Sequence, residues 1–339
     1  AMLVIVNGMV GHLPSLIQEI RALERAGFNI RPRLKISDRA HVVLPHYIAE
    51  DKRRESDPAT HIGTTQKGIG PAYSAKALRD GVRVGDFLSG WAGIKISDKE
   101  EFRSCREAFE MIRPCVCNTT ALLQDAAAYG SGILLEGAHV VMLDLDHGTY
   151  PWVTSSTTTT NGLLGGAGLN PFQLTRAIGV AKAYCTRVGD GPFPSEMNPK
   201  DSTIVGVKGN EFGSTTGRPR RCGWFDAVAI HYAIAINGTS ELFLTKLDVL
   251  SGFPLIRAVV GYRINGEMVT QFPSDLNRYP NFEPVYQEFA GWNEDITHCR
   301  TYADLPFQAR MYVEWIVSQY RMPVRISIGP RRDQMIMER

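Results

Sequence analysis

Residues 3–27, LVIVNGMVGHLPSLIQEIRALERAG, decide the fold class, because a strand pattern is followed directly by a helix pattern. Leu3–Val6 is a short aliphatic run, which predicts a buried strand, and Asn7-Gly8 after it predicts a turn. Pro14–Ala26 carries apolar residues Leu16, Ile17, Ile20 and Leu23 at helical spacing, with proline in the first turn and Gly27 after the end. A strand, a turn and a helix in this order form the repeating unit of α/β proteins.

The same alternation continues along the chain. Strands are predicted at Leu34–Ile36, Val42–Leu44, Ile133–Leu135, Val141–Leu145, Glu241–Leu244, Leu255–Arg263 and Val324–Ile328. Helices are predicted at Glu100–Arg113, Thr119–Tyr129, Asp226–Ile236 and Leu305–Tyr320. This mixture indicates an α/β fold in which helices cover a mostly parallel central sheet with added antiparallel hairpins. A chain of 339 residues has the size of one large or two ordinary domains, and no internal repeat or obvious linker is visible. Of the two, we expect a single domain over residues 1–339.

Composition excludes several classes of partner. Hydrophobic residues make up 44% and charged residues 21% of the chain, which is typical of a globular protein. A net charge of +2 without a polybasic run gives no reason to expect nucleic acid. The apolar start, AMLVIVNGMVG, lacks a basic region and is too short to cross a bilayer, so we expect no membrane association and a cytoplasmic location. The six cysteines form no paired CxxC set, which favours free thiols.

Residues 213–221, GSTTGRPRR, form what we call the arginine loop. Its threonines offer hydroxyl donors, and each guanidinium can bind a carboxylate or a phosphate through two hydrogen bonds. A solvated basic loop has the same composition. The apolar stretch that follows at residues 226–237 favours binding, because it predicts a rigid helix beside the loop.

A second loop, GTTQKGIGP at residues 63–71, has glycines that allow close backbone approach to a phosphate. It is not a Walker A loop, because GxxxxGK[ST] occurs nowhere in the chain. An ordinary turn would contain the same residue types.

The third loop, Glu136-Gly137-Ala138-His139, follows the predicted strand Ile133–Leu135. Polar residues beyond the carboxyl end of a parallel strand lie where α/β sheets bind ligands, so His139 could donate to a base or a phosphate. A histidine with a purely structural role is the alternative. Asp144 and Asp146 alternate with leucines, as on a half-exposed strand, and do not establish a metal site.

The fourth loop, Thr245-Lys246-Leu247-Asp248, follows the predicted strand Glu241–Leu244. GTP-binding proteins use a strand followed by [N/T]KxD to recognise guanine, because the aspartate accepts hydrogen bonds from guanine N1–H and the 2-amino group together. A chance surface loop can carry the same four residues. We call Lys246–Asp248 the guanine motif.

Taken in this order, the loops resemble those of adenylosuccinate synthetase, which joins IMP and L-aspartate at the expense of GTP. The resemblance covers essentially the whole chain and rests on long motifs: GTTQKGIGPAYSAKALRDGVRVGD, EGAHVVMLDLDHGTYPWVTSS, AYCTRVGDGPFPSE, GSTTGRPRRCGWFD and LTKLDVLSG. It implies a P-loop-NTPase-like fold and a GTP-dependent C–N ligase of purine and AMP biosynthesis. It also implies Mg²⁺ as a cofactor and a homodimer as the assembly.

The resemblance implies the following site residues. The IMP-side residues are Thr65, Arg79, His139, Thr154 and Arg218, of which Arg79 reaches across the dimer interface to the partner's IMP. The aspartate-side residues are Ser214, Thr215, Thr216, Gly217, Arg218, Pro219 and Arg220. The GTP-side residues are Arg220, Lys246, Leu247, Asp248, Ser327, Ile328 and Gly329. His139 departs from the family, in which Gln or Asn is expected to face the purine.

A larger departure concerns catalysis. Family members begin with a strand and the phosphate loop GDEGKGK, whose aspartate is the catalytic base and a Mg²⁺ ligand. A histidine in a later GHN-type turn acts as the acid. Neither the GDEGKGK loop nor the GHN-type turn occurs here. We expect the chain to begin where a family member is already on the order of 100 residues along. No catalytic residue and no metal ligand are therefore predicted in these 339 residues, which are expected to be inactive as given. The alternative is a non-catalytic homologue, or a folded fragment, that binds a purine nucleotide or a dicarboxylate.

Overall fold

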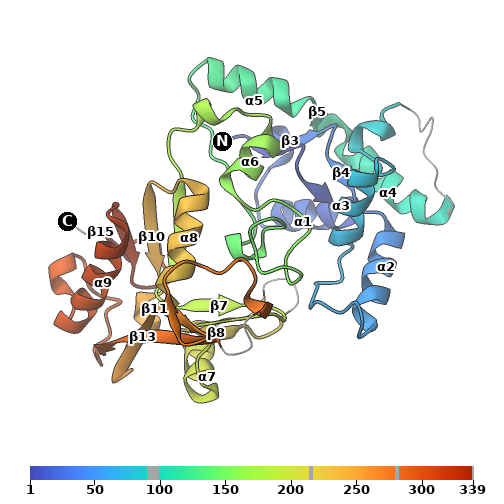
Figure 1. The fold of residues 1–339 in the computed structure, drawn as a ribbon. Coiled ribbons are helices and arrows are strands. Elements are labelled where there is room, and N and C mark those ends of the chain that lie inside the picture. The colour runs from blue at the N-terminus through green and yellow to red at the C-terminus, as the bar shows by residue number, and fades with distance from the viewer. Residues whose placement is uncertain (90–98, 214–216, 279–281, 338–339) are drawn as a thin grey trace. The chain divides into compact units, whose positions relative to one another are not determined.

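The computed structural model describes residues 1–89, 99–213, 217–278 and 282–337, and the chain divides into two compact units (Figure 1). Unit 1 contains residues 1–146 and 153–174, and unit 2 contains residues 147–152 and 175–339. Each unit has its own parallel sheet with packed helices, so the predicted α/β class is confirmed. A single domain over residues 1–339 stays a prediction, because two compact units can still belong to one domain.

The sheet of unit 1 is parallel. Its strands are β1 (Leu3–Ile5), β3 (Leu34–Ser37) and β5 (Val116–Cys117), in the order β1-β3-β5. A second parallel pair is formed by β2 (Val10–Gly11) and β4 (His41–Val42). The predicted first strand is therefore confirmed, and the turn at Asn7-Gly8 leads from it toward helix α1 (Leu13–Arg25).

Helix α1 packs the core of unit 1 through a narrower stripe than the sequence predicts. Leu13, Ile17 and Ile20 are buried, whereas Leu23 is exposed. These three residues belong to one hydrophobic cluster with Ile36 of β3 and with helix α4 (Lys99–Ile112). Burying one such aliphatic side chain contributes about 1.5–3 kcal/mol, so this stripe holds the helix on the sheet.

Unit 1 contains further helices. They are α2 (Pro45–Ser56), α3 (Ile69–Leu78), α5 (Thr119–Ala128) and α6 (Thr160–Ala167). Short 3-10 helices lie at Arg31–Arg33, Val84–Phe87, Arg113–Cys115, Val141–Leu143 and Pro171–Gln173. The strand predictions for Ile133–Leu135 and Val141–Leu145 are wrong. Leu134 is 85% exposed, and the described part of the chain pairs no strand with this segment. An apolar run becomes a strand only where another strand supplies the hydrogen bonds.

The main sheet of unit 2 has the order β15-β14-β10-β6. Its strands are β6 (Ile178–Lys182), β10 (Glu241–Thr245), β14 (Val324–Ser327) and β15 (Met335–Met337). Strand β10 runs parallel to both β6 and β14, and β15 is antiparallel to β14. The sequence predicts β10 and β14 correctly but misses β6.

The predicted hairpins form a second sheet in unit 2. The long strands β11 (Leu255–Ile264) and β13 (Phe282–Ala290) are antiparallel, with β12 (Glu267–Val269) and β9 (Phe225–Asp226) also paired to β11. Strands β7 (Cys185–Arg187) and β8 (Arg221–Gly223) form a separate antiparallel pair. The helices are α7 (Pro199–Lys208), α8 (Ala227–Asn237) and α9 (Phe307–Tyr320), with 3-10 helices at Leu247–Leu250, Leu276–Arg278 and Tyr302–Asp304.

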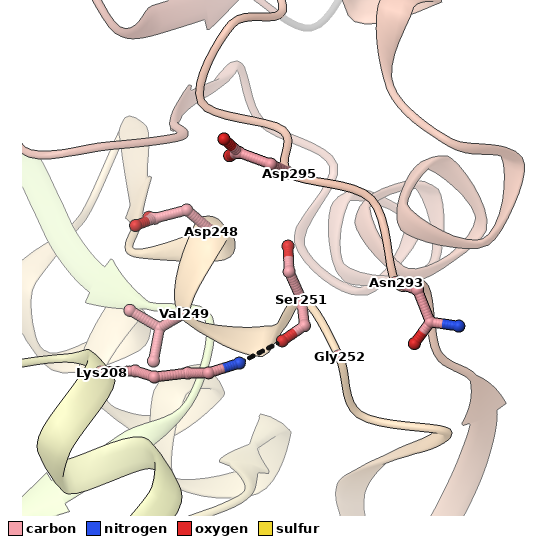
Figure 2. A pocket seen from close by; sticks show the side chains of 7 residues that line it. All are labelled: Lys208, Asp248, Val249, Ser251, Gly252, Asn293 and Asp295. Atoms are coloured by element: carbon pink, nitrogen blue, oxygen red, sulfur yellow. Dashed lines mark hydrogen bonds between the residues drawn. The ribbon is translucent and has the colours of Figure 1, made fainter.

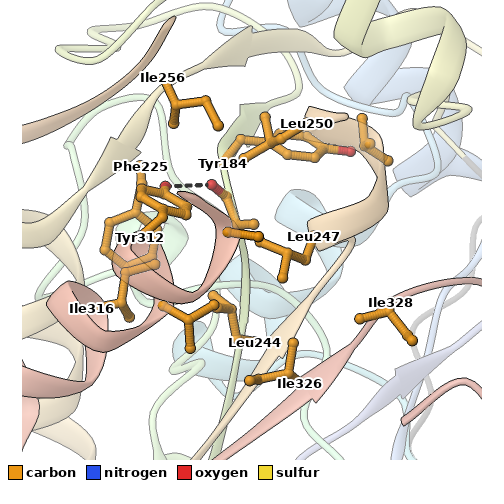
Figure 3. Close-up of a cluster of buried hydrophobic side chains, with 14 of the residues drawn as sticks. Tyr184, Phe225, Leu244, Leu247, Leu250, Ile256, Tyr312, Ile316, Ile326 and Ile328 are labelled. Carbon is orange, nitrogen blue, oxygen red and sulfur yellow. Dashed lines mark hydrogen bonds between the residues drawn. The ribbon is translucent and has the colours of Figure 1, made fainter. Parts of the chain in front are cut away.

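The core of unit 2 lies beneath the carboxyl ends of the parallel strands (Figure 3). Leu244, Leu247 and Ile326 are fully buried there against Tyr312 of α9. The Tyr312 hydroxyl donates a hydrogen bond of 2.8 Å to the backbone oxygen of Ala183, just after β6. This packing fixes the loops that leave the sheet at that edge.

Two further predictions concern the whole chain. All six cysteines are free thiols, as predicted. Over the described ranges, no helix combines the length and the apolar character needed to cross a membrane.

Candidate functional site

The parallel strands of unit 2 bring three distant segments to one edge of the sheet. Thr245 lies opposite Lys182 on β6, and Leu244 lies opposite Ile326 on β14. The guanine motif and the turn Ser327–Gly329 therefore leave the sheet beside each other. The carboxyl edge of a parallel sheet is the usual ligand-binding edge of α/β proteins. The sequence places both segments on the GTP side, and the strand register places them together.

A buried carboxylate, Glu211, collects the charged groups at this edge. Its Oε1 accepts hydrogen bonds from Lys246 Nζ at 2.7 Å and from the Tyr184 hydroxyl at 2.6 Å. Its Oε2 accepts from Lys182 Nζ and from Arg220 Nη1, both at 2.8 Å. We call these five residues the Glu211 cluster. The cluster joins two predicted GTP-side residues, Arg220 and Lys246.

The electrostatics of the cluster favour an anionic ligand. Burial alone would raise the pKa of Glu211, but the donors Lys182, Lys246 and Tyr184 lower it to about 2. The carboxylate is therefore ionised, and the three cations around it leave a formal excess of two positive charges. Burial lowers the pKa of Lys182 and raises that of Tyr184. The cations remain 22–34% exposed while the carboxylate is fully covered, so the positive side of the cluster faces outward.

The aspartate of the guanine motif lines a cavity of about 360 Å³ (Figure 2). The lining residues are Lys208, Asp248, Val249, Ser251, Gly252, Asn293 and Asp295. Asp248 forms no ion pair with any described residue, and burial raises its pKa. Lys208 donates instead to the backbone oxygen of Ser251 at 2.6 Å, and Asp295 accepts from the Thr297 N–H at 2.9 Å. Of the two acids that line this cavity, Asp248 is thus the better placed to accept hydrogen bonds from a ligand.

The turn Ser327–Gly329 is held tightly. The Ser327 hydroxyl donates to the Gly329 oxygen at 2.9 Å, and a Cβ on Gly329 would collide with the side chain of Gln334. Ile328 and Leu247 are fully buried in the core. A ligand at this edge can therefore meet these two residues only through their backbone groups.

The flanks of the arginine loop pair with each other. The Arg220 N–H donates to the Glu211 oxygen at 2.9 Å, and the Gly213 N–H donates to the Arg218 oxygen at 2.8 Å. Gly217 has φ +67°, which glycine adopts without strain, and Pro219 forms a bridge with Phe212. The predicted aspartate-side residues Ser214, Thr215 and Thr216 lie outside the described residues.

The last arginine of the loop serves another purpose. Arg221 forms an ion pair with Glu196, with Nε 2.7 Å from Oε1, and also donates to the Gly191 oxygen at 2.9 Å. Arg220 therefore joins the Glu211 cluster, whereas Arg221 pairs with Glu196.

In unit 1, the loop at residues 63–71 rests on two buried acids of α2. Asp51 accepts from the Gly68 N–H at 2.8 Å, and Glu55 accepts from the Thr64 N–H at 3.0 Å. A Cβ on Gly68 would lie 2.8 Å from the Ile48 nitrogen, so only glycine fits there at φ +75°. Two backbone donors expected to hold a phosphate are thus used internally, and Thr65 is left exposed on the loop.

The segment around Thr154 lies beside the start of α3. A Cβ on Gly70 would be 3.2 Å from Ser155 Oγ, so the two segments touch. Thr154 donates its N–H to the Leu143 oxygen at 2.8 Å. Asp144 accepts backbone N–H groups from Asp146 at 2.9 Å and from Thr158 at 2.5 Å. Asp144 therefore anchors this loop, whereas Thr65 and Thr154 belong to adjacent segments.

Arg79 and His139 are the other IMP-side predictions that lie in unit 1. Arg79 ends α3, whose ten residues span ~15 Å, so it stands at the far end of the helix from the loop. It is exposed and lines a cavity of about 210 Å³ with His41, Lys76, Gly81, Arg83 and Asp86. His139 has φ +74°, and partial burial lowers its pKa. In the described part of the chain, no hydrogen bond joins His139 to Thr65 or Thr154.

Sequence reasoning misses the centre of the cluster, namely Glu211, Lys182 and Tyr184. The available indications are an apolar run at residues 178–181 directly before Lys182, and the position of Glu211 two residues before the arginine loop.

Among the described residues, no group of three or more His, Cys, Asp or Glu side chains is placed to hold a metal ion.

Comparison with known proteins agrees with the resemblance. The family model for adenylosuccinate synthetase matches residues 1–336. The chain is 43% identical to the adenylosuccinate synthetase of Carboxydothermus hydrogenoformans, covering 98% of this chain and 83% of that protein. It is 40% identical to the enzyme of Paramecium tetraurelia, covering 99% and 82%. The fully ligated adenylosuccinate synthetase of Plasmodium falciparum superposes with a TM-score of 0.92 at 35% identity, covering 99% of this chain and 84% of that one.

Proposed function

We propose, because the chain belongs to the adenylosuccinate synthetase family, that it binds GTP, IMP and L-aspartate as the reactants of a GTP-dependent ligation. The family is one of ligases in AMP biosynthesis, and GTP binding follows from membership. The assignment of ligands to the residues of this chain is our own.

The position of Asp248 is the observation that carries the proposal. Its carboxylate lines the cavity beside the guanine motif without an ion-pair partner among the described residues. Guanine offers two adjacent N–H donors that one carboxylate can accept, and adenine does not. A half-buried carboxylate without an ion-pair partner is partly desolvated, so the site gains most from a ligand that supplies both donors.

The GTP phosphates would lie over the exposed side of the Glu211 cluster. Arg220 and Lys246 offer charged donors there, and Lys182 adds another positive charge. Backbone groups of Ser327–Gly329 border the same edge of the sheet. Charge-assisted hydrogen bonds from such groups are the strong contacts to phosphate oxygens.

The arginine loop is our candidate for the aspartate side. Arg218 and Pro219 follow Gly217, and their backbones pair with Gly213 and Phe212. This pairing fixes where the loop returns to β8. On the IMP side, we assign Thr65 and Thr154, which belong to touching segments of unit 1. His139 is kept as an IMP-side candidate, and Arg79 is assigned to the IMP of a partner subunit.

The family reaction moves the GTP γ-phosphoryl group to the 6-oxygen of IMP, after which the aspartate amine displaces phosphate. The first step needs a base for the N1 proton of IMP. Glu211 cannot serve, because a pKa of about 2 makes its carboxylate a very weak base. Mg²⁺ is implied by the family, but the described residues offer no cluster that fits it, and no step is assigned to it. We therefore propose that these 339 residues bind the reactants without turning them over.

Adenylosuccinate formation tests the proposal. The purified 339-residue chain is mixed with IMP, GTP, L-aspartate and Mg²⁺, and binding is measured in parallel by calorimetry. We expect GTP and IMP to bind and no adenylosuccinate to form. Clear turnover would show that these residues contain a sufficient base, and failure to bind GTP would refute the nucleotide assignment.

A non-catalytic homologue that binds a purine nucleotide or a dicarboxylate is the second candidate. The coding DNA upstream of Met2 separates the two. An in-frame GDEGKGK-like segment supports the ligase, and an immediate stop codon supports the binding homologue.

A further inference from the structure

We propose that Glu211 is a positioning residue, which holds Arg220, Lys182 and Lys246 in one arrangement ready for a polyphosphate. Nothing in the sequence motifs points to this residue, and it contacts no ligand itself because its carboxylate is fully covered. The inference rests on the proposed function, since it assigns a role to the GTP side of that site.

The carboxylate has no spare capacity. Each oxygen accepts two hydrogen bonds, from Lys246 and Tyr184 on Oε1 and from Lys182 and Arg220 on Oε2, all between 2.6 and 2.8 Å. Four good donors around a buried carboxylate fix the direction of every donor side chain. Glu211 therefore acts on the surroundings by orienting its partners.

These bonds connect separate parts of unit 2. Arg220 ends the described flank of the arginine loop, Lys246 begins the guanine motif, and Lys182 ends β6. The link is reinforced by the backbone, because the Arg220 N–H donates to the Glu211 oxygen and Lys246 Nζ donates to the Gly209 oxygen at 2.5 Å. Lys246 adopts φ +61°, which places its side chain at the turn after β10. One residue thus sets the position of cations from three segments.

The oriented cations keep donors for a ligand. Lys246 uses two of its three N–H donors, on Glu211 and Gly209. Lys182 also uses two, on Glu211 and on Thr186 Oγ1 at 2.7 Å. Arg220 donates to Glu211 through Nη1 alone. Each of these three side chains is partly exposed, so a chain of phosphates can accept the donors that Glu211 leaves unused.

Positioning and simple charge balance predict opposite effects when Glu211 loses its charge. If Glu211 only neutralised its neighbours, Glu211→Gln would raise the excess positive charge from two to three and tighten anion binding. If Glu211 positions them, the same change releases three long side chains that repel one another, and anion binding weakens. Whether Glu211→Gln tightens or weakens anion binding therefore distinguishes charge neutralisation from positioning.

The test uses inorganic tripolyphosphate as the probe, titrated by calorimetry into the 339-residue chain. We expect Glu211→Gln to weaken binding about tenfold, because immobilised side chains become free. Glu211→Asp keeps the charge but withdraws the carboxylate, and we expect a similar loss. Tyr184→Phe removes one orienting donor without changing the charge, and we expect it to weaken tripolyphosphate binding about threefold. Glu196→Gln, which breaks the separate ion pair with Arg221, is the matched control and should leave binding unchanged.

Tighter binding by Glu211→Gln, or wild-type binding by Glu211→Asp, would overturn the proposal, as would a wild-type chain that does not bind tripolyphosphate. If Glu211→Gln does not fold, the Asp and Phe variants decide in the same way. A different result would show that the proposed function is wrong while the role of Glu211 is right. Tripolyphosphate would then bind with the predicted dependence on Glu211, while GTP would bind no more tightly than ATP.

Discussion

Lys246 Nζ lies 2.7 Å from Glu211 Oε1, so the first residue of the guanine motif is bonded to a residue that stands two positions before the arginine loop. The two segments are more than thirty positions apart in the chain. This carboxylate connects Arg220 and the guanine motif at one edge of the sheet. The following predictions test the packing, the charges and the assembly that this arrangement requires.

Gly209 makes room for the Glu211 cluster. A Cβ at this position would collide with the Tyr184 hydroxyl and lie 2.9 Å from the Val205 oxygen. We expect Gly209→Ala to lower the free energy of unfolding by about 1–3 kcal/mol, because the crowded hydroxyl is itself bonded to Glu211. Urea unfolding measures the change. Gly206→Ala is the control: its Cβ meets only Cys222 Sγ at 4.0 Å, and alanine should stabilise helix α7 by about 0.5–1 kcal/mol. Equal effects at both positions would contradict this account of Gly209.

Asp226 makes unit 2 sensitive to pH. Burial raises its pKa from 3.8 to about 6, although the Ala229 N–H and the Tyr262 hydroxyl donate to it. A folded pKa above the unfolded one gives stability that is complete below pH 3.8 and is lost as the pH rises through 6. The loss amounts to about 3 kcal/mol. We expect Asp226→Asn to abolish this part of the pH dependence, measured by urea unfolding between pH 4 and 8.

Asp333→Asn is the control for that experiment, because its exposed carboxylate pairs only with Arg331 and such pairs contribute little. The assignment to Asp226 is wrong if the wild-type protein and the Asp226→Asn variant lose stability in parallel across that pH range.

Arg79 and Thr65 stand at opposite ends of α3, which fits a site shared between subunits. We predict that Thr65→Val and Arg79→Leu each weaken IMP binding about tenfold, through loss of a phosphate contact. Mixing the two variants should restore roughly a quarter of the tight sites, because a heterodimer contains one site with both native residues. Calorimetric titration of the mixture counts those sites. Arg25→Leu, an exposed change at the end of α1, should leave binding unchanged. No recovery on mixing would place both residues in one chain's site or in none.

Local sequence patterns predict much of this fold and less of the site. Strand β10 and helix α9 follow from aliphatic runs and helical spacing, and the guanine motif follows from its place after a strand. Ile133–Leu135 shows the limit, because its apolar run has no partner strand among the described residues and Leu134 is largely exposed. Pairing between distant segments is what decides a strand, and spacing within one segment does not contain that information.

The Glu211 cluster could not be predicted for the same reason. Glu211 looks like an ordinary surface acid until β6 and β10 pair in register and bring Lys182 and Lys246 to the same edge. A lone glutamate in a sequence is most often solvated, and only its burial against three cations shows its role. The sequence analysis assigns Arg220 and Lys246 to the same side of the site, and the structure shows that both bond to Glu211, whose place between them is visible only in the structure.

The central claim is that Asp248 gives this site its preference for guanine, and nucleotide affinity tests it most directly. GTP and ATP are titrated in the presence of Mg²⁺ into the wild-type chain, Asp248→Asn and the control Asp295→Asn, which lines the same cavity. We predict that the wild-type chain and Asp295→Asn prefer GTP by at least about 100-fold. Asp248→Asn should lose most of that preference by weakening GTP binding alone. Equal affinity of the wild-type chain for GTP and ATP, or an unchanged preference in Asp248→Asn, would contradict the account.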